Sequence, residues 1–250
     1  MPPPFTFTLT VPVTYNSNID NADSDRRHDI HTDPTIQLDY AQQSGALRPF
    51  ARVMADADEY FDHEENGAST LVGRFGLKLF DPALGAWVPY AHYTGALVYG
   101  RHFEDHQLTL HTFAAGIGGK VPLGNVIMKP DFQIARRDAS NSVANRNQAG
   151  ISLLFLGDFV PDKVSWSLSQ AAQARHYTGG ANEGRDDLNF VTSAGVSVVL
   201  SKLFSLEVNA SFEHNSSDRT GKDYSVFDIG PSIVLSIPFG SSPPASGSGG

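Results

Sequence analysis

Apolar and hydroxyl side chains alternate residue by residue at the start of the chain, and this period decides what the chain can fold into. Odd positions over 5–15 are all apolar or aromatic, whereas Thr6, Thr8, Thr10 and Thr14 lie between them. Side chains alternate faces along a β-strand, so a strand would have one apolar face and one hydroxyl face. An α-helix would scatter both sets around its circumference. The pattern therefore predicts a strand.

The same two-residue period returns along the rest of the chain. Two of the later segments, 87–99 and 108–120, are blurred, and 150–158 is apolar on both faces until Asp158. The further predicted strands lie near 36–40, 53–56, 71–79, 87–99, 108–120, 128–134, 150–158, 164–169, 193–200, 204–213 and 227–239. No stretch has a convincing helical period. The sequence therefore predicts an all-β fold of about twelve strands.

The connections between these strands alternate between long and short. The long ones are rich in Asp, Asn, Gly and His and lie near 16–34, 59–69, 100–107, 138–149, 177–189 and 214–223. The short ones lie near 44–49, 81–86, 121–125, 159–163 and 201–203. An up-and-down meander with an even strand number places all long loops at one end, and both termini with the short turns. Soluble barrels have no reason to separate loop lengths so consistently.

Two terminal segments fall outside the strand pattern. Residues 1–4 lack the basic start and the apolar core of a secretion signal, and we expect an N-terminal extension at the mature end of an exported chain. Residues 240–250 consist of Gly, Ser, Pro and Ala, and we expect a flexible tail or linker. The predicted barrel therefore covers residues 5–239.

Composition excludes several function classes. The 250 residues include no cysteine, which removes disulfide scaffolds, thiolate zinc sites and cysteine nucleophiles. The net charge is −9, and this argues against nucleic-acid binding because phosphate neutralisation needs clustered Lys and Arg. No uncharged apolar stretch approaches the roughly 20 residues of a membrane-spanning helix. Strands of a membrane barrel, which are short and alternate in polarity, are compatible with this composition.

The last predicted strand carries a more specific feature. Residues 232–239 alternate apolar side chains and end in the aromatic Phe239. With the even strand number and the separated loop lengths, this segment resembles the terminal assembly signal of bacterial outer-membrane β-barrels. Two features depart from that class, because Pro238 lies inside the signal and the chain continues eleven residues past Phe239. The resemblance is to a class, and no single family matches residue by residue.

This resemblance covers nearly the whole folded chain and implies a place for it. It implies a closed, up-and-down, antiparallel transmembrane barrel in the bacterial outer membrane, with short periplasmic turns and long extracellular loops. The implied partners are outer-membrane lipids, lipopolysaccharide and the barrel-assembly machinery, which would bind the strand that ends at Phe239. Amphipathic rings near predicted strand ends would anchor at the headgroups. They are Tyr15, Trp87, Tyr90, Tyr93, Tyr99, Trp166 and Tyr177.

Charged residues on the polar face of the predicted strands would point into the barrel. We predict that they line a narrow, water-filled pore, because charged walls select solutes. The predicted pore-lining residues are Asp39, Arg52, Asp56, Arg74, Lys78, Lys129, Asp131, Arg137, Glu207, Glu213 and Asp228. A network of ion pairs that fills and braces a closed lumen would use the same residues.

These residues predict a channel for the passive diffusion of small hydrophilic solutes or ions, with no cofactor and no bound metal. Acidic residues are frequent in the predicted loops 16–34 and 59–69. They would attract cations within a Debye length, about 8 Å at physiological salt, which predicts a weak cation preference. A solvated acidic surface that meets divalent cations bound to lipopolysaccharide explains the same residues.

Two other functions stay open. A barrel-anchored surface hydrolase would need a His-Asp couple to activate water, and His102–His106 with Asp56 and Asp58 could imitate one in a protease. A lipase-like site would need His and Ser on one face, and His92-Tyr93-Thr94 is the nearest pattern. Neither spacing is distinctive. The other alternative is a closed barrel with a structural or anchoring role.

Overall fold

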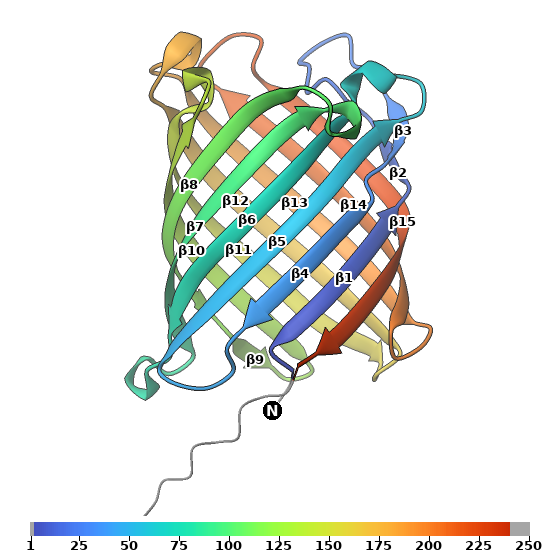
Figure 1. Ribbon diagram of the computed structural model, residues 1–250, viewed down its shortest axis with the longest axis vertical. Coiled ribbons are helices and arrows are strands. Elements are labelled where there is room, and N and C mark those ends of the chain that lie inside the picture. The colour runs from blue at the N-terminus through green and yellow to red at the C-terminus, as the bar shows by residue number, and fades with distance from the viewer. Residues whose placement is uncertain (1–2, 241–250) are drawn as a thin grey trace, which may run out of the picture.

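A computed structural model describes residues 3–240 and forms a closed antiparallel β-barrel (Figure 1). The sheet closes where β1 (Phe5–Pro12) pairs with β15 (Tyr224–Phe239), from Phe5 opposite Phe239 to Pro12 opposite Ser232. Closure pairs the first strand with the last and leaves no open sheet edge. The tail predicted at 240–250 lies outside the described residues from 241 onward.

Three short strands extend or continue longer ones, so the fifteen assigned strands make twelve that cross the barrel. β2 (Thr14–Asn16) keeps the register of β1 against β15. β3 (Asp29–Thr32) and β4 (Thr35–Ala41) pair with β2 and β1 in the same register, so they act as one continuous strand. β9 (Val121–Leu123) only adds to β10 (Val126–Ala139). The prediction of a twelve-stranded, closed, up-and-down barrel is confirmed.

The remaining strands pair in sequence order around the barrel. They are β5 (Leu47–Tyr60), β6 (Ala68–Leu79), β7 (Trp87–Gly100), β8 (His106–Gly119), β11 (Arg146–Val160), β12 (Val164–Tyr177), β13 (Asp186–Val199) and β14 (Phe204–Ser217). The long connections lie together at one end, and the tight turns and the start of β1 lie at the other (Figure 1). Short 3-10 turns occur at both ends. Within residues 3–240, no helix is long and apolar enough to span a membrane.

Several strands extend further than the alternation indicates. β5 spans Leu47–Tyr60, although its pattern is recognisable only near 53–56. Phe50 is an apolar residue on the polar face, and Glu59 is a charged residue on the apolar face, so the period is lost at both ends of β5. In the same way, β3 occupies part of the predicted loop 16–34. The hydrogen-bonded ladder continues where the side-chain pattern has stopped.

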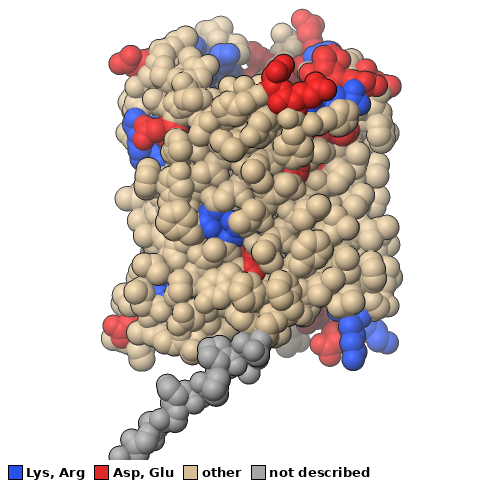
Figure 2. Space-filling model, in the orientation of Figure 1, with Lys and Arg blue, Asp and Glu red and all other residues tan. Residues whose placement is uncertain are grey.

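The apolar face of the strands forms the outside of the barrel. Its members remain exposed although they are large, and Ile134, Phe75 and Phe113 expose 66%, 61% and 57% of their surface. Uncharged residues make up most of the surface between the charged ends, with a small basic and a small acidic group showing near the middle (Figure 2). An exposed apolar surface of this extent would cause aggregation in water, whereas lipid solvates it. A closed sheet also pairs the backbone groups that lipid cannot satisfy.

The barrel lacks an ordinary apolar core. The buried hydrophobic residues among those described are only Tyr60, Ala114, Tyr177 and Val226. Buried polar residues are more numerous and include Asn18, Asp29 and Asp187. The fold is therefore held by ladder hydrogen bonds and by lipid contact outside, and its polar side chains line the interior.

Two neighbouring positions in the middle of β13 test this division. Ala194 lies on the outer face and Ser193 on the inner face. We expect Ala194→Arg to destabilise the barrel by about 2–4 kcal/mol, the cost of a charge at the bilayer midplane on the lipid face. Ser193→Arg is the matched control, because its charge faces polar side chains. The measurement is urea unfolding in lipid vesicles, followed by tryptophan fluorescence. Equal effects of the two variants would contradict the assigned faces.

Candidate functional site in the barrel lumen

Strand register places the eleven predicted lining residues on the inner face. Directly paired residues share a face, and Asp39 pairs with Arg52, which pairs with Arg74. Their neighbours Leu38 and Val53 are exposed on the outside. By the same criterion the inner face carries Asp56, Lys78, Lys129, Asp131, Arg137, Glu207, Glu213 and Asp228. Their role in solute passage stays a prediction.

Hydrogen bonds hold several of these side chains against the wall. The Arg52 Nε donates to Asp39 Oδ1 at 2.7 Å. The Tyr90 hydroxyl donates to Asp131 Oδ1 at 2.8 Å and accepts from Gln133 Nε2 at 3.2 Å. Inner-face polar groups are thus partly satisfied by one another, so they are oriented along the wall.

Two of the rings predicted to anchor at the headgroups face the lumen instead. Tyr90 bonds to Asp131 inside the barrel, and Tyr177 is buried opposite the inner-face residue Arg146. Inward-facing and outward-facing residues alternate along each strand, and both tyrosines occupy inward-facing positions. The blurred pattern of 87–99 obscures this alternation. Tyr15 and Tyr93 face outward, as predicted, and Tyr93 contacts the outer ring of Phe113 at 5.0 Å between centroids.

A cavity of about 1990 Å³ runs along the inner wall. Its inward-facing residues are cross-strand partners of one another and form a row around the wall. Because the strands are tilted, this row starts in β6 near the tight turns and ends in β14 at the loops. The row contains Gly76, His92, Ala114, Ala135, Gln148, Arg175, Asp187 and Ser217. Three members of the row, Gly76, Ala114 and Ala135, have small side chains or none.

A second cavity of about 450 Å³ lies at the end with the tight turns. Its lining mixes polar and apolar groups, and the polar ones on the inner face include Asp158, Ser165, Ser197 and Glu207. The Ser197 hydroxyl donates to Glu207 Oε1 at 3.4 Å. Polar space is thus present near both ends of the lumen.

Acidic side chains gather on one side of the lumen, near the loops. Asp56 and Asp58 face inward on β5, and their charges act on Asp33, between β3 and β4. We name these three residues the acidic wall. Asp58 also lies 2.5 Å from His31 Nδ1, measured from its Oδ1.

Basic side chains gather on the other side. Arg137 on β10 pairs with Arg146 on β11, and Arg175 lies on β12. We name these three residues the basic wall. Three strands separate the two walls in one direction around the barrel and four in the other, so the walls face each other across the lumen.

The sequence pattern missed Asp33 and Arg146, because both fall in predicted loops. Each nevertheless continues the two-residue spacing of inner positions, Asp33 between His31 and Thr35 and Arg146 before Gln148. Polar residues on both faces hide this spacing at the strand ends. Continuing the alternation of inner and outer residues beyond the apolar segment of each strand would have identified Asp33 and Arg146.

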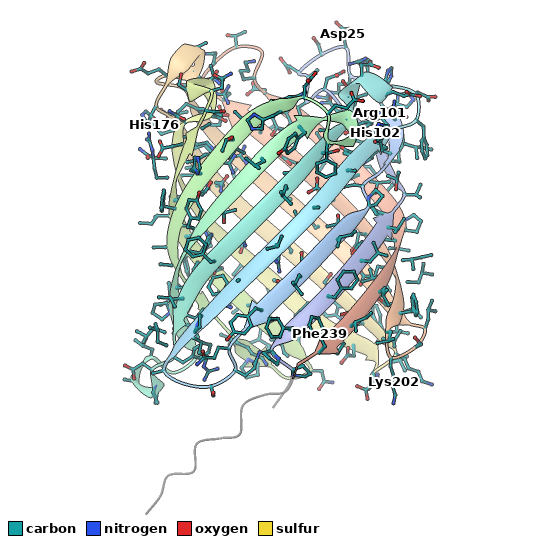
Figure 3. All side chains as sticks on the ribbon, viewed as in Figure 1. Asp25, Arg101, His102, His176, Lys202 and Phe239 are labelled. Atoms are coloured by element: carbon teal, nitrogen blue, oxygen red, sulfur yellow. The ribbon has the colours of Figure 1, made fainter. Side chains whose placement is uncertain are left out.

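Arginine side chains tie the long loops together at the mouth. Arg27 binds Asp20, with Nη2 and Oδ1 2.5 Å apart, and Glu65, with Nη1 and Oε1 3.0 Å apart. Arg101 binds Glu59, with Nε and Oε2 2.6 Å apart, and also contacts Glu64. The acidic and basic groups crowd at this end of the barrel (Figure 2), and Arg101 lies among them (Figure 3).

These contacts shift the protonation equilibria of the loops. The hydrogen bond from Arg27 lowers the pKa of Asp20. A backbone amide hydrogen bond and then the bond from Arg27 lower the pKa of Glu65. Hydrogen bonds to Glu59 and Glu64 raise the pKa of Arg101. These loop groups therefore stay charged over a wider pH range than free side chains do.

The residues considered for hydrolysis do not assemble as the sequence suggests. His106 Nε2 lies 3.0 Å from Thr109 Oγ1, and His102 Nε2 lies 2.9 Å from Glu59 Oε1. Asp56 and Asp58 instead belong to the acidic wall inside the lumen. In His92-Tyr93-Thr94, the ring of Tyr93 faces outward while His92 and Thr94 face inward. In the part of the chain that the structure describes, no three His, Asp or Glu side chains are arranged to hold a metal ion.

No family model matches the chain, and no curated protein matches its sequence. Solved structures match its fold. LpxR from Salmonella typhimurium is 8% identical with a TM-score of 0.50, and the match covers 92% of this chain and 99% of that chain. The anion-selective porin from Comamonas acidovorans is 10% identical with a TM-score of 0.48, over 93% and 98% of the two chains. Likeness at this identity concerns the fold alone.

The chain is a bacterial outer-membrane β-barrel. The closed sheet, the largely uncharged outer surface and the likeness to outer-membrane barrels of solved structure agree on this. The structure therefore confirms the class and the outer-membrane location predicted from the sequence. In this outer-membrane barrel, the lumen brings charged side chains, small residues and both of the cavities described above together.

Two glycines of β6 test how tightly the inner face of the wall is packed. A Cβ on the inner-face Gly76 would lie 2.6 Å from Phe50 Cζ and would overlap the Ala91 carbonyl, whereas one on the outer-face Gly73 would meet nothing within 4 Å. We expect Gly76→Ala to destabilise the barrel by about 1–3 kcal/mol through overpacking. Gly73→Ala, the control, should be neutral or slightly stabilising. Chemical unfolding in vesicles measures both, and a neutral Gly76→Ala would refute the tight contact.

Proposed function

We propose that the barrel is a passive channel for small hydrophilic solutes or ions. The main support is the cavity of about 1990 Å³, whose inner row of residues leads from the tight-turn end of the wall to the loops. A twelve-stranded wall encloses more space than an eight-stranded one, which side chains just fill. Charged and hydroxyl groups along the inner face would replace part of the hydration of a passing solute.

We further propose that the channel weakly prefers cations. The loop 17–28 carries Asp20, Asp23 and Asp25, and the next long loop carries Asp62, Glu64 and Glu65. Ion pairs with Arg27 and Arg101 offset part of this negative charge. The remaining field would enrich cations at the mouth only modestly, and salt would screen it.

Partners beyond the solute are proposals of the same kind. The apolar outer face would contact outer-membrane lipids, and the charged loop end would meet lipopolysaccharide. The strand that ends at Phe239 would present the assembly signal. Pro238 keeps its register opposite Thr6, and the Phe239 ring stacks on Phe5 at 5.5 Å between centroids. The proline therefore fits at the end of this strand, as a strand terminus allows.

The channel is tested by placing a single thiol on each face of the wall. The chain has no cysteine, so Ser193→Cys on the inner face and Ala194→Cys on the outer face each create its only thiol. We expect discrete conductance steps in planar bilayers. A charged methanethiosulfonate reagent should reduce the current through the Ser193→Cys barrel, because the added group narrows the lumen.

The reagent should leave the wild-type current and the Ala194→Cys current unchanged. Modification of Ser193→Cys, verified by mass spectrometry, without any change in current would contradict passage through the lumen. A folded barrel that never conducts would favour a closed anchoring role. Hydrolytic turnover that is lost in His106→Ala would favour the surface hydrolase.

A further inference from the structure

The basic wall concentrates positive charge at one place on the inner face. Arg137 and Arg146 are direct cross-strand partners, and Arg175 lies one strand further, opposite Gln148. The charges of Arg146 and Arg175 both act on Arg137. Like charges in direct opposition on a sheet are unfavourable, so this arrangement needs a compensating group.

Protein carboxylates supply only part of the compensation: Asp187 is the direct cross-strand partner of Arg175, and its charge also acts on Arg146. Among residues 3–240, no Asp or Glu oxygen lies within 4.0 Å of a side-chain nitrogen of Arg137, Arg146 or Arg175. The hydrogen bonds of the nearby carboxylates go to other partners. Asp187 accepts from Arg185 Nη2 at 2.8 Å, and Glu213 accepts from the Tyr224 hydroxyl at 2.6 Å.

Two of the three guanidinium groups are held in place by neutral partners. Arg146 donates from Nε to Gln148 Oε1 at 3.1 Å and from Nη1 to the Tyr177 hydroxyl at 3.2 Å. Arg175 donates from Nε to Gln173 Oε1 at 2.6 Å. These bonds fix the positions of the two side chains while they leave both positive charges in place.

Arg137 is the arginine of the basic wall whose hydrogen bonding is incomplete. Its Nε is buried and has no hydrogen-bond partner among the described residues. A buried donor left without a partner is costly, and in native structures it indicates an ordered water or ion. Among these three arginines, Arg175 lines the large cavity, so a solute in the lumen can reach the basic wall at Arg175.

We propose that Arg137, Arg146 and Arg175 form an oxyanion-binding site in the lumen, which takes a carboxylate, phosphate or sulfate group of a solute. Guanidinium groups present planar forks of donors that match such groups. The ligand would supply the acceptor that Arg137 lacks and would screen the repulsion among the three arginines. The site rests on the proposed channel only for the entry of its ligand.

The test compares two adjacent arginines of β10. Arg137 faces the lumen, whereas Arg136 faces outward and binds Asp138, with Nη2 and Oδ1 2.7 Å apart. Inorganic phosphate is titrated by calorimetry into the folded barrel in detergent at low ionic strength. We expect one saturable site, and Arg137→Gln and Arg146→Gln should each weaken it by about tenfold or more, as loss of a charged hydrogen-bond donor does.

Arg136→Gln removes the same charge from the other face and should leave the affinity unchanged. No saturable phosphate binding would overturn the proposal and would mean that water alone satisfies Arg137. Equal weakening by Arg136→Gln would overturn it as well, because binding would then follow net charge. Binding in a barrel that never conducts would refute the channel and keep the site, whereas conduction without binding would do the reverse.

Discussion

Backbone hydrogen bonding in a solvent that offers none is the constraint on which this structure depends. Lipid has no donors or acceptors, so every N–H and C=O inside the membrane must find a partner in the sheet. The closing ladder from Phe5–Phe239 to Pro12–Ser232 completes that requirement. Beyond this ladder, the Val13 amide donates to the Pro231 carbonyl at 2.9 Å, so the pairing between the first and last strands continues past Pro12 and Pro231.

Closure also decides where polar side chains go. Once alternate residues face lipid, the other half of each strand has to share a lumen, and charged groups there must pair, meet water or meet a ligand. The lumen contains a direct ion pair, a carboxylate hydrogen-bonded by a neutral donor, and a cluster of like charges. Asp39 and Arg52 pair directly, the Tyr90 hydroxyl donates to Asp131 and accepts from Gln133, and protein carboxylates compensate the basic wall only in part.

The distribution of charge gives the lumen two different sides. The acidic wall at Asp33, Asp56 and Asp58 faces the basic wall across the barrel, while the loops above tie themselves together through Arg27 and Arg101. A solute that enters would thus meet a negative mouth and then a wall of each sign. The weak cation preference proposed for the mouth and the oxyanion site proposed for the lumen act at different levels of the same path.

Much of the fold was predictable because a strict period of two survives in the sequence. Thr6, Thr8 and Thr10 show which face of β1 is inside, and the separated loop lengths indicate the up-and-down order. The site was predictable only where the alternation is clean. Arg146 and Asp33 were missed because both lie at strand ends that carry polar residues on both faces. The opposition of the two walls depends on tilt and closure, which no single segment encodes.

The central claim is that the inner wall encloses a water-filled path, and a high-resolution experimental map viewed along the barrel axis tests it most directly. The account predicts solvent density that continues from the loop end, past the row from Ser217 to Gly76, to the polar cavity at the tight turns. A lumen filled throughout by side chains or by inserted loops, with no continuous solvent, would contradict it.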